Sequence, residues 1–381
     1  SKTNSPACYT VRMFFGRNRS ARKAGPTTVV IFGATGDLAR KKLFPALFSL
    51  YRAKRLPKEC AIIAFSRREQ TSEAFRVSLA PLLASAGRAK FLRCIQYVQG
   101  FFDDVSAYER LAAMLRANDA VISRCANKLF YLAVSPTLYA SILSHLARAR
   151  LSLPCGGKES PPVPVRAGFA RICMEKPFGT SATEACRWVG LGARLFQPEQ
   201  IFRVDHYLAK EGLHRMFAFR RRGRFEPVWD GAHIASIQVR LYETAGIGGR
   251  GALYDKLGAL CDVGQNHLLA MLASAAMEFP VVFSAESVRA KRAAVLGALR
   301  PLRTARAATF GQYEGYRAET GVRRHSRTET YFSARAALAL PRWRGIEIFL
   351  EAGKGLGISR ADITVVMRDC KLKWNSEWKS G

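Results

Sequence analysis

A short segment near the middle of the chain combines residue types that can hold a phosphate and move a proton. The segment Arg203–Glu211 contains His206, Tyr207 and Lys210, which supply hydrogen-bonding groups and a point charge. A second segment, Asp262–His267, adds a carboxylate and another imidazole, groups that can take a proton from a hydroxyl. The two segments predict a site for a phosphorylated small molecule with acid–base chemistry.

Each of these side chains alone is also typical of ordinary structural or surface positions. A single His, Tyr or Lys is more often an exposed residue than a phosphate ligand, and a His beside Asn266 is more often structural. Asp262 and His267 are five residues apart, so they need not share a face of a helix. Only the combination is specific, and it depends on elements that bring its members together.

The first half of the chain has the pattern of a parallel sheet with crossover helices. Apolar runs predict strands at Thr27–Phe32, Ala61–Phe65, Leu129–Val134 and Phe169–Met174. Leucines at helical spacing follow the first run, and Pro45 should kink or restart that helix because proline removes a backbone donor. Strands alternating with helices favour an α/β fold, a doubly wound Rossmann-type domain.

The turn after the first strand is a candidate cofactor site. Glycines there let the backbone approach a pyrophosphate, whose charge faces the amides of the following helix. Such a glycine turn also occurs for purely structural reasons. The candidate residues are Gly33, Thr35, Gly36, Asp37 and Leu38.

Two basic residues follow later strands at the same expected edge of the sheet. Arg67 stands where a cofactor site for plain NAD would place an acidic residue, so it favours the 2′-phosphate of NADP. In a chain this rich in arginine it is also an ordinary surface residue. Lys176 follows the strand at Phe169–Met174, where it can touch substrate and nicotinamide together.

The pattern changes after about residue 205. Strands are expected at Ile234–Tyr242, Thr328–Leu340 and Ile346–Leu350, with helices at Gln265–Met277 and Ala285–Leu299. We therefore expect three parts: a basic arm at 1–26, a cofactor domain at 27–204 with a Pro/Gly-rich insertion at 151–168, and an α+β domain at 205–381. The last of these should contain a large, mostly antiparallel sheet.

The charge of the chain is unusual. Its 381 residues include 60 Lys and Arg against 29 Asp and Glu, a formal net charge of +31. This excess favours polyanions such as RNA or an anionic membrane, although solvated surface arginine is the plainer interpretation. The nine cysteines form no Cys-x-x-Cys pair, so no metal site or disulfide framework is indicated. No apolar run is long enough for a membrane span.

The first thirty residues carry basic side chains and no acidic ones. This composition resembles the remains of an organellar presequence, or equally an ordinary frayed terminus. We expect an organellar location, with the mitochondrial matrix favoured and the cytoplasm as the alternative.

These motifs, in this order, resemble the glucose-6-phosphate dehydrogenase family from about Thr27 to Arg360. The resemblance implies NADP as cofactor, glucose 6-phosphate as substrate, and a phosphogluconolactone and NADPH as products of hydride transfer from C1. The motifs that carry it are Gly33–Leu38, Leu129–Ala133, Glu175–Gly179, Arg203–Glu211, Gly249–Gly251, Asp262–Leu269, Gly311–Tyr313 and Gly353–Lys354.

The same resemblance implies a role for each site residue. His267 would be the base that removes the proton from the anomeric hydroxyl, and Asp205 would orient His267 and stabilise its protonated form. The residues implied to bind the 6-phosphate are His206, Tyr207 and Lys210, and those implied to contact the sugar are Lys176, Glu243, Asp262 and Lys354.

Several positions depart from the family pattern. Ala209 replaces a glycine, Ser135 a proline and Arg215 an asparagine. The expected substrate-site arginine five residues after Lys354 is Ser359, with Arg360 one place late. These departures predict weaker substrate binding before they predict lost chemistry.

A second function stays open beside the dehydrogenase. The printed chain ends at Gly381, before the family's sheet is complete, so we expect an exposed sheet edge that invites a partner. With the basic stretches Arg220–Arg224 and Arg289–Arg306, this favours a weakly active or inactive subunit or maturation factor of an RNA-containing organellar assembly such as the mitochondrial ribosome.

Overall fold

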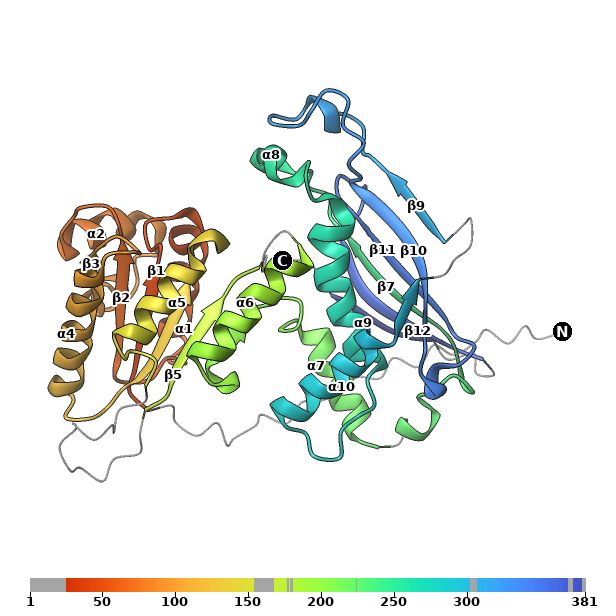
Figure 1. Cartoon of the computed structure of the whole chain (residues 1–381), viewed down its shortest axis with the longest axis horizontal. Helices are drawn as coiled ribbons and strands as arrows, with labels where there is room; N and C mark the ends of the chain where they lie inside the picture. Colours follow the sequence, from red (N-terminus) through yellow and green to blue (C-terminus); the bar gives the residue numbers. More distant parts are fainter. Residues whose placement is uncertain are drawn as a thin grey trace. The chain divides into compact units, whose positions relative to one another are not determined.

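The structure is a computed structural model that describes residues 25–153, 168–176, 178, 181–223, 225–301, 307–368 and 373–378. The chain divides into two compact units between Val204 and Asp205, which we name the N-terminal and C-terminal units and describe separately (Figure 1). Nearly all of the arm predicted at 1–26 and most of the insertion predicted at 151–168 lie outside the described residues.

The N-terminal unit is built on a parallel sheet of six strands, in the order β3-β2-β1-β4-β5-β6. The order reverses between β1 and β4, which places the topological switch point beside the glycine turn that follows β1. The strands are β1 (Thr27–Phe32), β2 (Cys60–Ser66), β3 (Ile95–Gln99), β4 (Asn127–Leu132), β5 (Ala170–Met174) and β6 (Ile201–Arg203).

Helices cover both faces of this sheet because both faces of its strands are apolar. Along β1, Val29 and Ile31 join one core while Val30 and Phe32 join the other. The first core is closed by α1 (Phe44–Arg52), α2 (Ser72–Leu79) and α3 (Arg88–Arg93), and the second by α4 (Val105–Val121), α5 (Tyr139–Arg148) and α6 (Ala182–Leu195). The doubly wound α/β domain is confirmed.

The helix after the glycine turn is irregular where the sequence predicts it. A π-helical turn at Ala39–Leu43 precedes α1, and Pro45 lies in the first turn of α1. Proline has no N–H to continue the hydrogen-bond ladder, so the helix begins again at this point.

The C-terminal unit contains a larger mixed sheet in the order β13-β12-β7-β11-β10-β8, with β9 paired to β10. Only β7 and β11 run parallel; the other described pairs are antiparallel. The strands are β7 (Ile234–Tyr242), β8 (Leu299–Pro301), β9 (Ala308–Gly311), β10 (Tyr331–Leu338), β11 (Glu347–Gly353), β12 (Arg360–Met367) and β13 (Lys373–Trp378). The mostly antiparallel sheet is confirmed.

Helices pack on one face of this sheet and build its main core (Figure 1). Leu213 and Met216 of one helix and Met271 and Leu272 of another meet the apolar strand residues there. These helices are α7 (Glu211–Arg221), the π-helix η7 (Leu260–Leu268), α9 (Leu269–Ala276) and α10 (Ala285–Gly297), while α8 (Gly251–Tyr254) belongs to a separate small cluster. Within the described residues, no helix combines the length and apolar character that crossing a membrane requires.

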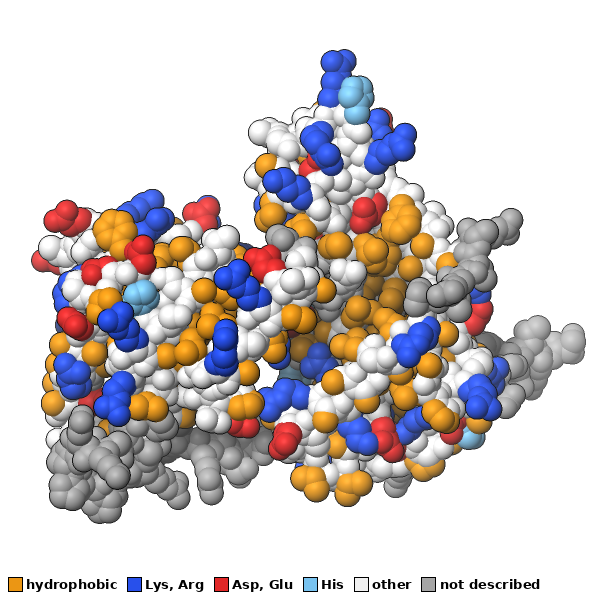
Figure 2. Space-filling model, viewed as in Figure 1, with side chains coloured by type: hydrophobic (Ala, Val, Ile, Leu, Met, Phe, Trp, Pro, Cys, Tyr) orange, Lys and Arg blue, Asp and Glu red, His pale blue; other side chains and the backbone are white. Residues whose placement is uncertain are grey.

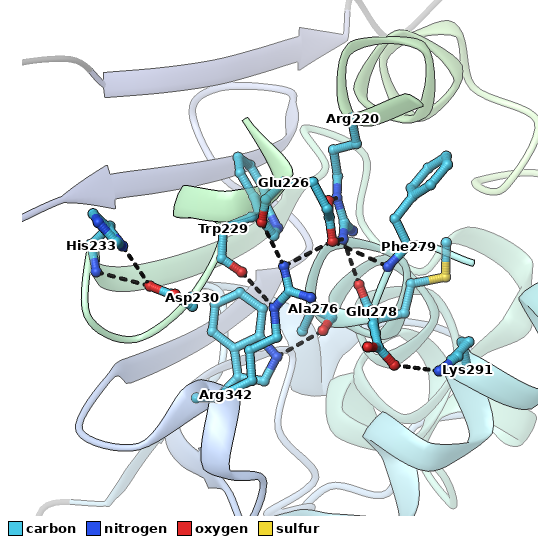
Figure 3. A network of polar contacts seen from close by, with 12 residues as sticks. Arg220, Glu226, Trp229, Asp230, His233, Ala276, Glu278, Phe279, Lys291 and Arg342 are labelled. Carbon is cyan, nitrogen blue, oxygen red and sulfur yellow. Dashed lines mark hydrogen bonds and ion pairs between the residues drawn. The ribbon is translucent and has the colours of Figure 1, made fainter. Parts of the chain in front are cut away.

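At the arginine-rich end of α7, Arg220 is buried, whereas Arg221 and Arg222 are exposed as the sequence predicts. Arg220 is only 1% exposed, and its guanidinium donates hydrogen bonds to the carbonyls of Ala275 and Met277 at 3.0 and 2.6 Å. The same group pairs with Glu226 at 2.9 Å, and Glu226 also binds Arg342 at 2.8 Å (Figure 3). Arg220 therefore closes the C-terminal end of α9, whose last carbonyls need donors.

The remaining basic side chains do not gather in one place on the face that Figure 2 shows. Lys and Arg are scattered over it and interspersed with acidic and apolar side chains. Within the described part of 220–224, Arg220 is buried while Arg221 and Arg222 are exposed, so the exposed basic group is smaller than the sequence predicts.

Candidate active site

A buried histidine–aspartate pair forms the centre of the site. Nδ1 of His267 lies 2.8 Å from Oδ1 of Asp205, and His267 is 8% exposed. Oδ1 of Asp205 also accepts the backbone N–H of Tyr207 at 2.9 Å, which fixes the carboxylate. In the neutral imidazole, a proton on Nδ1 that is donated to Asp205 leaves Nε2 as the basic nitrogen.

The irregular helix η7 explains how Asp262 and His267 share one site. The sequence predicts an α-helix from Gln265, in which residues five apart diverge. Leu260–Leu268 is instead a π-helix, whose hydrogen bonds join residues i and i+5. Residues five apart are therefore closer in direction around the helix axis than they would be in an α-helix. Asp262 approaches Lys354 and His267 pairs with Asp205.

The predicted phosphate ligands surround the imidazole of His267. The ring centres of His206 and Tyr207 lie 4.7 and 4.2 Å from that of His267. Lys210, the residue that precedes α7, holds its Nζ 5.5 Å from the centre of the Tyr207 ring. Two hydrogen-bonding rings, an ammonium group and a helix N-terminus make a setting that suits a phosphate.

The protonation of Tyr207 is fixed by its surroundings. Burial, followed by the nearby carboxylates of Glu243 and Asp205, raises the pKa of the Tyr207 phenol well above its usual value. The phenol therefore stays protonated and is available as a hydrogen-bond donor.

The predicted sugar ligands of the C-terminal unit form a second cluster around a buried lysine. Lys354 is 4% exposed, pairs with Glu243 and lies 3.6 Å from Asp262. Its position follows from the sheet: Glu243 comes at the end of β7, Lys354 follows β11, and these two strands run side by side in parallel. The cluster offers two carboxylates and an ammonium group to the hydroxyls of a sugar.

Sequence reasoning assigned no role to two neighbours of this cluster. Arg250 approaches Asp262 at 3.9 Å, and the Tyr254 ring lies 5.8 Å from Nζ of Lys354. Burial, then the carboxylate of Asp262, raises the pKa of the Tyr254 phenol. The Gly249–Gly251 motif was the available signal for Arg250, while nothing local marked Tyr254.

The glycine turn of the N-terminal unit has the geometry of a dinucleotide cradle. Gly33 has a φ of +80°, and a Cβ there would lie 2.5 Å from the carbonyl oxygen of Ala133. A side chain would fill the space, so glycine is required. Thr35 is bound to Ser66 at 2.7 Å, while Gly36, Asp37 and Leu38 are exposed at the start of the helix. These residues fit a pyrophosphate.

The other predicted cofactor residues lie at the carboxyl ends of the parallel strands. Arg67 is exposed directly after β2, with its guanidinium 5.8 Å from the centre of the Phe102 ring. Lys176 is half-buried after β5, next to Glu175, whose carboxylate accepts the Tyr131 hydroxyl. Carboxyl ends are where open α/β sheets bind their ligands.

Two of the residues that depart from the family pattern, Ala209 and Ser135, show no strained backbone angle. Ala209 has no positive φ, since the non-glycine residues with positive φ in the described part of the chain are Lys54, Ser123 and Arg150. Ser135 has a φ of −57°, which is close to the angle that proline imposes.

The other two departures from the family pattern concern positively charged residues: one is missing near Lys354, and one is added on the surface of α7. Arg360 turns to the buried Asp362, with bonds of 2.8 and 3.1 Å, and Ser359 is exposed 3.5 Å from the Thr244 hydroxyl. Arg215 pairs with Glu211 on the surface of α7. Arg360 therefore does not replace the arginine that the family pattern places at Ser359.

The chain combines a doubly wound domain that carries a dinucleotide cradle with a unit that carries a nearly buried histidine–aspartate pair, and these are the features of a dinucleotide-dependent oxidoreductase. The comparisons with known proteins agree. Residues 30–214 match the model of the glucose-6-phosphate dehydrogenase NAD binding domain, and residues 217–380 match that of the C-terminal domain of the same enzyme.

Individual relatives are similar over nearly the whole chain. It is 33% identical to cytoplasmic glucose-6-phosphate 1-dehydrogenase 5 of Arabidopsis thaliana over 91% of this chain and 68% of the relative. It is also 33% identical to glucose-6-phosphate 1-dehydrogenase 2 of Mycobacterium tuberculosis, over 92% of this chain and 70% of the relative. A solved glucose-6-phosphate dehydrogenase in complex with its substrate glucose-6-phosphate superposes with a TM-score of 0.81 at 31% identity, over 92% of this chain and 73% of that one.

The chain belongs to the glucose-6-phosphate dehydrogenase family. The predicted family, fold and NADP cofactor are confirmed, and the protein is an oxidoreductase of the glucose-6-phosphate dehydrogenase type. Nothing in these comparisons supports the alternative of a ribonucleoprotein subunit or a mitochondrial, RNA-bound location.

Proposed function

We propose that this chain catalyses the oxidation of glucose 6-phosphate at C1 with NADP, giving a phosphogluconolactone and NADPH. The observation that carries the proposal is the buried Asp205–His267 pair with His206 and Tyr207 packed against it. In this proposal, the base His267 and the carboxylate of Asp205 that orients it lie next to the residues that bind the substrate phosphate.

The residues divide the reaction into binding and proton transfer. His206, Tyr207 and Lys210 hold the 6-phosphate, while the cluster of Glu243, Asp262 and Lys354 receives the sugar hydroxyls. This fixes C1 against the imidazole, and such positioning lowers the entropic part of the barrier. A role for Lys176 at the sugar is part of the same proposal.

His267 acts as the base through Nε2. It takes the proton of the C1 hydroxyl as the C1–H bond breaks, and Asp205 stabilises the resulting imidazolium through Nδ1–H. When bound, the nicotinamide accepts the hydride that leaves C1. The side chains of His267 and Asp205 are only 10% and 12% exposed, so little water reaches this charge pair. The attraction between the two charges is therefore stronger than at the surface.

The test is NADPH formation by the purified chain from glucose 6-phosphate and NADP, compared with a His267→Gln variant. We expect turnover by the wild-type chain and a large loss in the variant. His233→Gln is the matched control, because His233 forms an equally short pair with Asp230 on the surface. Equal rates in wild type and His267→Gln would overturn the proposal.

A further inference from the structure

The sequence predicts no metal site because it has no Cys-x-x-Cys pair and no His/Cys cluster at ligand spacing, yet the fold brings His267 to the adjacent residues Asp205 and His206. One ligand atom each from Asp205, His206 and His267 lies within 4.8 Å of the other two. Asp205 and His267 are 62 residues apart in the sequence, so spacing rules cannot detect the group. Two imidazoles and a carboxylate are ligands that suit zinc, cobalt and nickel.

We infer that Asp205, His206 and His267 form a binding site for a divalent transition metal ion, and that the ion blocks the base. Ligands of one tetrahedral ion are roughly 3.3 Å apart, given bonds of about 2.0–2.1 Å. Nδ1 of His267 and Oδ1 of Asp205 are 2.8 Å apart. A shift of about half an ångström lets the ion take the place of the shared proton between these two residues. The ligand atom of His206 lies within 4.8 Å of the other two, so this exposed side chain must move closer, by up to about 1.5 Å, to complete the set.

The consequence for the base follows from the proton balance. When the ion binds Nδ1, the neutral imidazole keeps its proton on Nε2 instead. Nε2 then has no lone pair for the C1 hydroxyl, and Asp205 no longer accepts a hydrogen bond from His267. No proton is gained or lost by the ring, yet the base is disabled.

The surface pair Asp230–His233 supplies a matched control. Its Nδ1···Oδ1 distance is also 2.8 Å, but no third ligand of the described residues joins it at metal distance. If a histidine–aspartate pair alone were sufficient for binding, both places would hold a metal. The third ligand, His206, is exposed, so changing it tests coordination and leaves the core intact.

Calorimetric titration of the full chain with Co²⁺, without substrate or cofactor, tests the site apart from turnover. We expect one dominant site that His206→Gln and Asp205→Asn each weaken by roughly tenfold or more, while His233→Gln leaves it unchanged. Similar affinity in wild type and His206→Gln would overturn the inference. So would a cobalt–thiolate absorption band that grows with binding, because it would assign the metal to the free cysteines.

Inhibition by Zn²⁺ is the functional readout, and the blocking of the base that it measures rests on the proposed function. We expect Zn²⁺ to raise the apparent KM for glucose 6-phosphate, because the ion occupies His206 of the phosphate site and the base His267. A chelator should restore activity. If the chain binds Co²⁺ as expected but has no dehydrogenase activity, the metal site stands and the proposed function fails.

Discussion

Two histidine–aspartate pairs among the described residues of the C-terminal unit have the same separation and different surroundings. In both, Nδ1 lies 2.8 Å from a carboxylate oxygen. The Asp205–His267 pair has side-chain exposures of 12% and 10%, whereas Asp230–His233 has 31% and 48%. The first is packed against aromatic rings, and the second lies at the entrance to β7 (Figure 3). The two pairs therefore share the same Nδ1–carboxylate distance, and they differ in burial and in the ligand groups around them.

The sharpest way to break this comparison is to remove each imidazole in turn. His267→Gln should lower kcat roughly 10²- to 10⁴-fold, the usual contribution of a general base, while His233→Gln should leave kcat unchanged. Initial rates at saturating substrate measure both. A loss of similar size in the two variants would show that geometry alone, without burial, confers the function.

The same contrast between buried and exposed charge extends to the arginines at the end of α7. Arg220→Met should lower the free energy of unfolding by about 1.5–3 kcal/mol, because it removes the buried donor to the Met277 carbonyl and one of the two arginines paired with Glu226. Arg221→Met, at an exposed position, should change it by less than about 0.5 kcal/mol. Urea unfolding of both variants is the measurement, and equal effects would contradict the burial of Arg220.

A pair of aspartates sharpens the comparison through pH. Burial alone would raise the pKa of Asp255, but hydrogen bonds from Ser326, Arg323 and Tyr316 outweigh it and hold the pKa far below its usual value. The hydrogen bond with His233 lowers the pKa of the more exposed Asp230. A lowered folded-state pKa contributes stability above the unfolded pKa, and this contribution is lost as the pH falls below it.

Asp255→Asn should therefore cost about 1.5–3 kcal/mol at neutral pH and reduce the loss of stability that the wild type shows below about pH 4. Asp230→Asn should cost less than about 0.5 kcal/mol. Unfolding titrations at neutral and acidic pH give both values. An unchanged acid dependence in Asp255→Asn would rule out Asp255 as a source of it.

The sequence predicted the features that depend on neighbouring residues along the chain. It missed those that depend on residues far apart in the sequence or on an unusual helix spacing. The strand and glycine turn at Thr27–Gly36 depend on neighbours along the chain, and both were predicted. The π-helix at Leu260–Leu268 was not, because a search for apolar periodicity assumes α-helical spacing. Roles for Asp205 and His267 came from the family resemblance, since no local pattern joins them.

Burial of polar residues was the other gap. The strand β12 (Arg360–Met367) was missed because Asp362 is unfavourable in a strand, yet it is fully buried and bound by Arg360 and Thr364. Arg220 was assigned to the surface for the same reason. Charged residues are assigned to solvent by default, and only the fold shows which of them have buried partners.

The smallest expected effect concerns a charge placed at an exposed edge of the site. Ser359→Arg restores the cation that the family pattern has near Lys354, on the loop that faces Thr244 beside Glu243. An exposed charge pair contributes at most about 1 kcal/mol, so the KM for glucose 6-phosphate should fall by up to about fivefold with kcat unchanged. Ile358→Arg, one place earlier and also exposed, is the control for added charge alone. If both variants lower KM equally, the effect is general electrostatic attraction; a fall confined to Ser359→Arg would show that this edge of the site contacts the substrate phosphate or sugar despite its exposure.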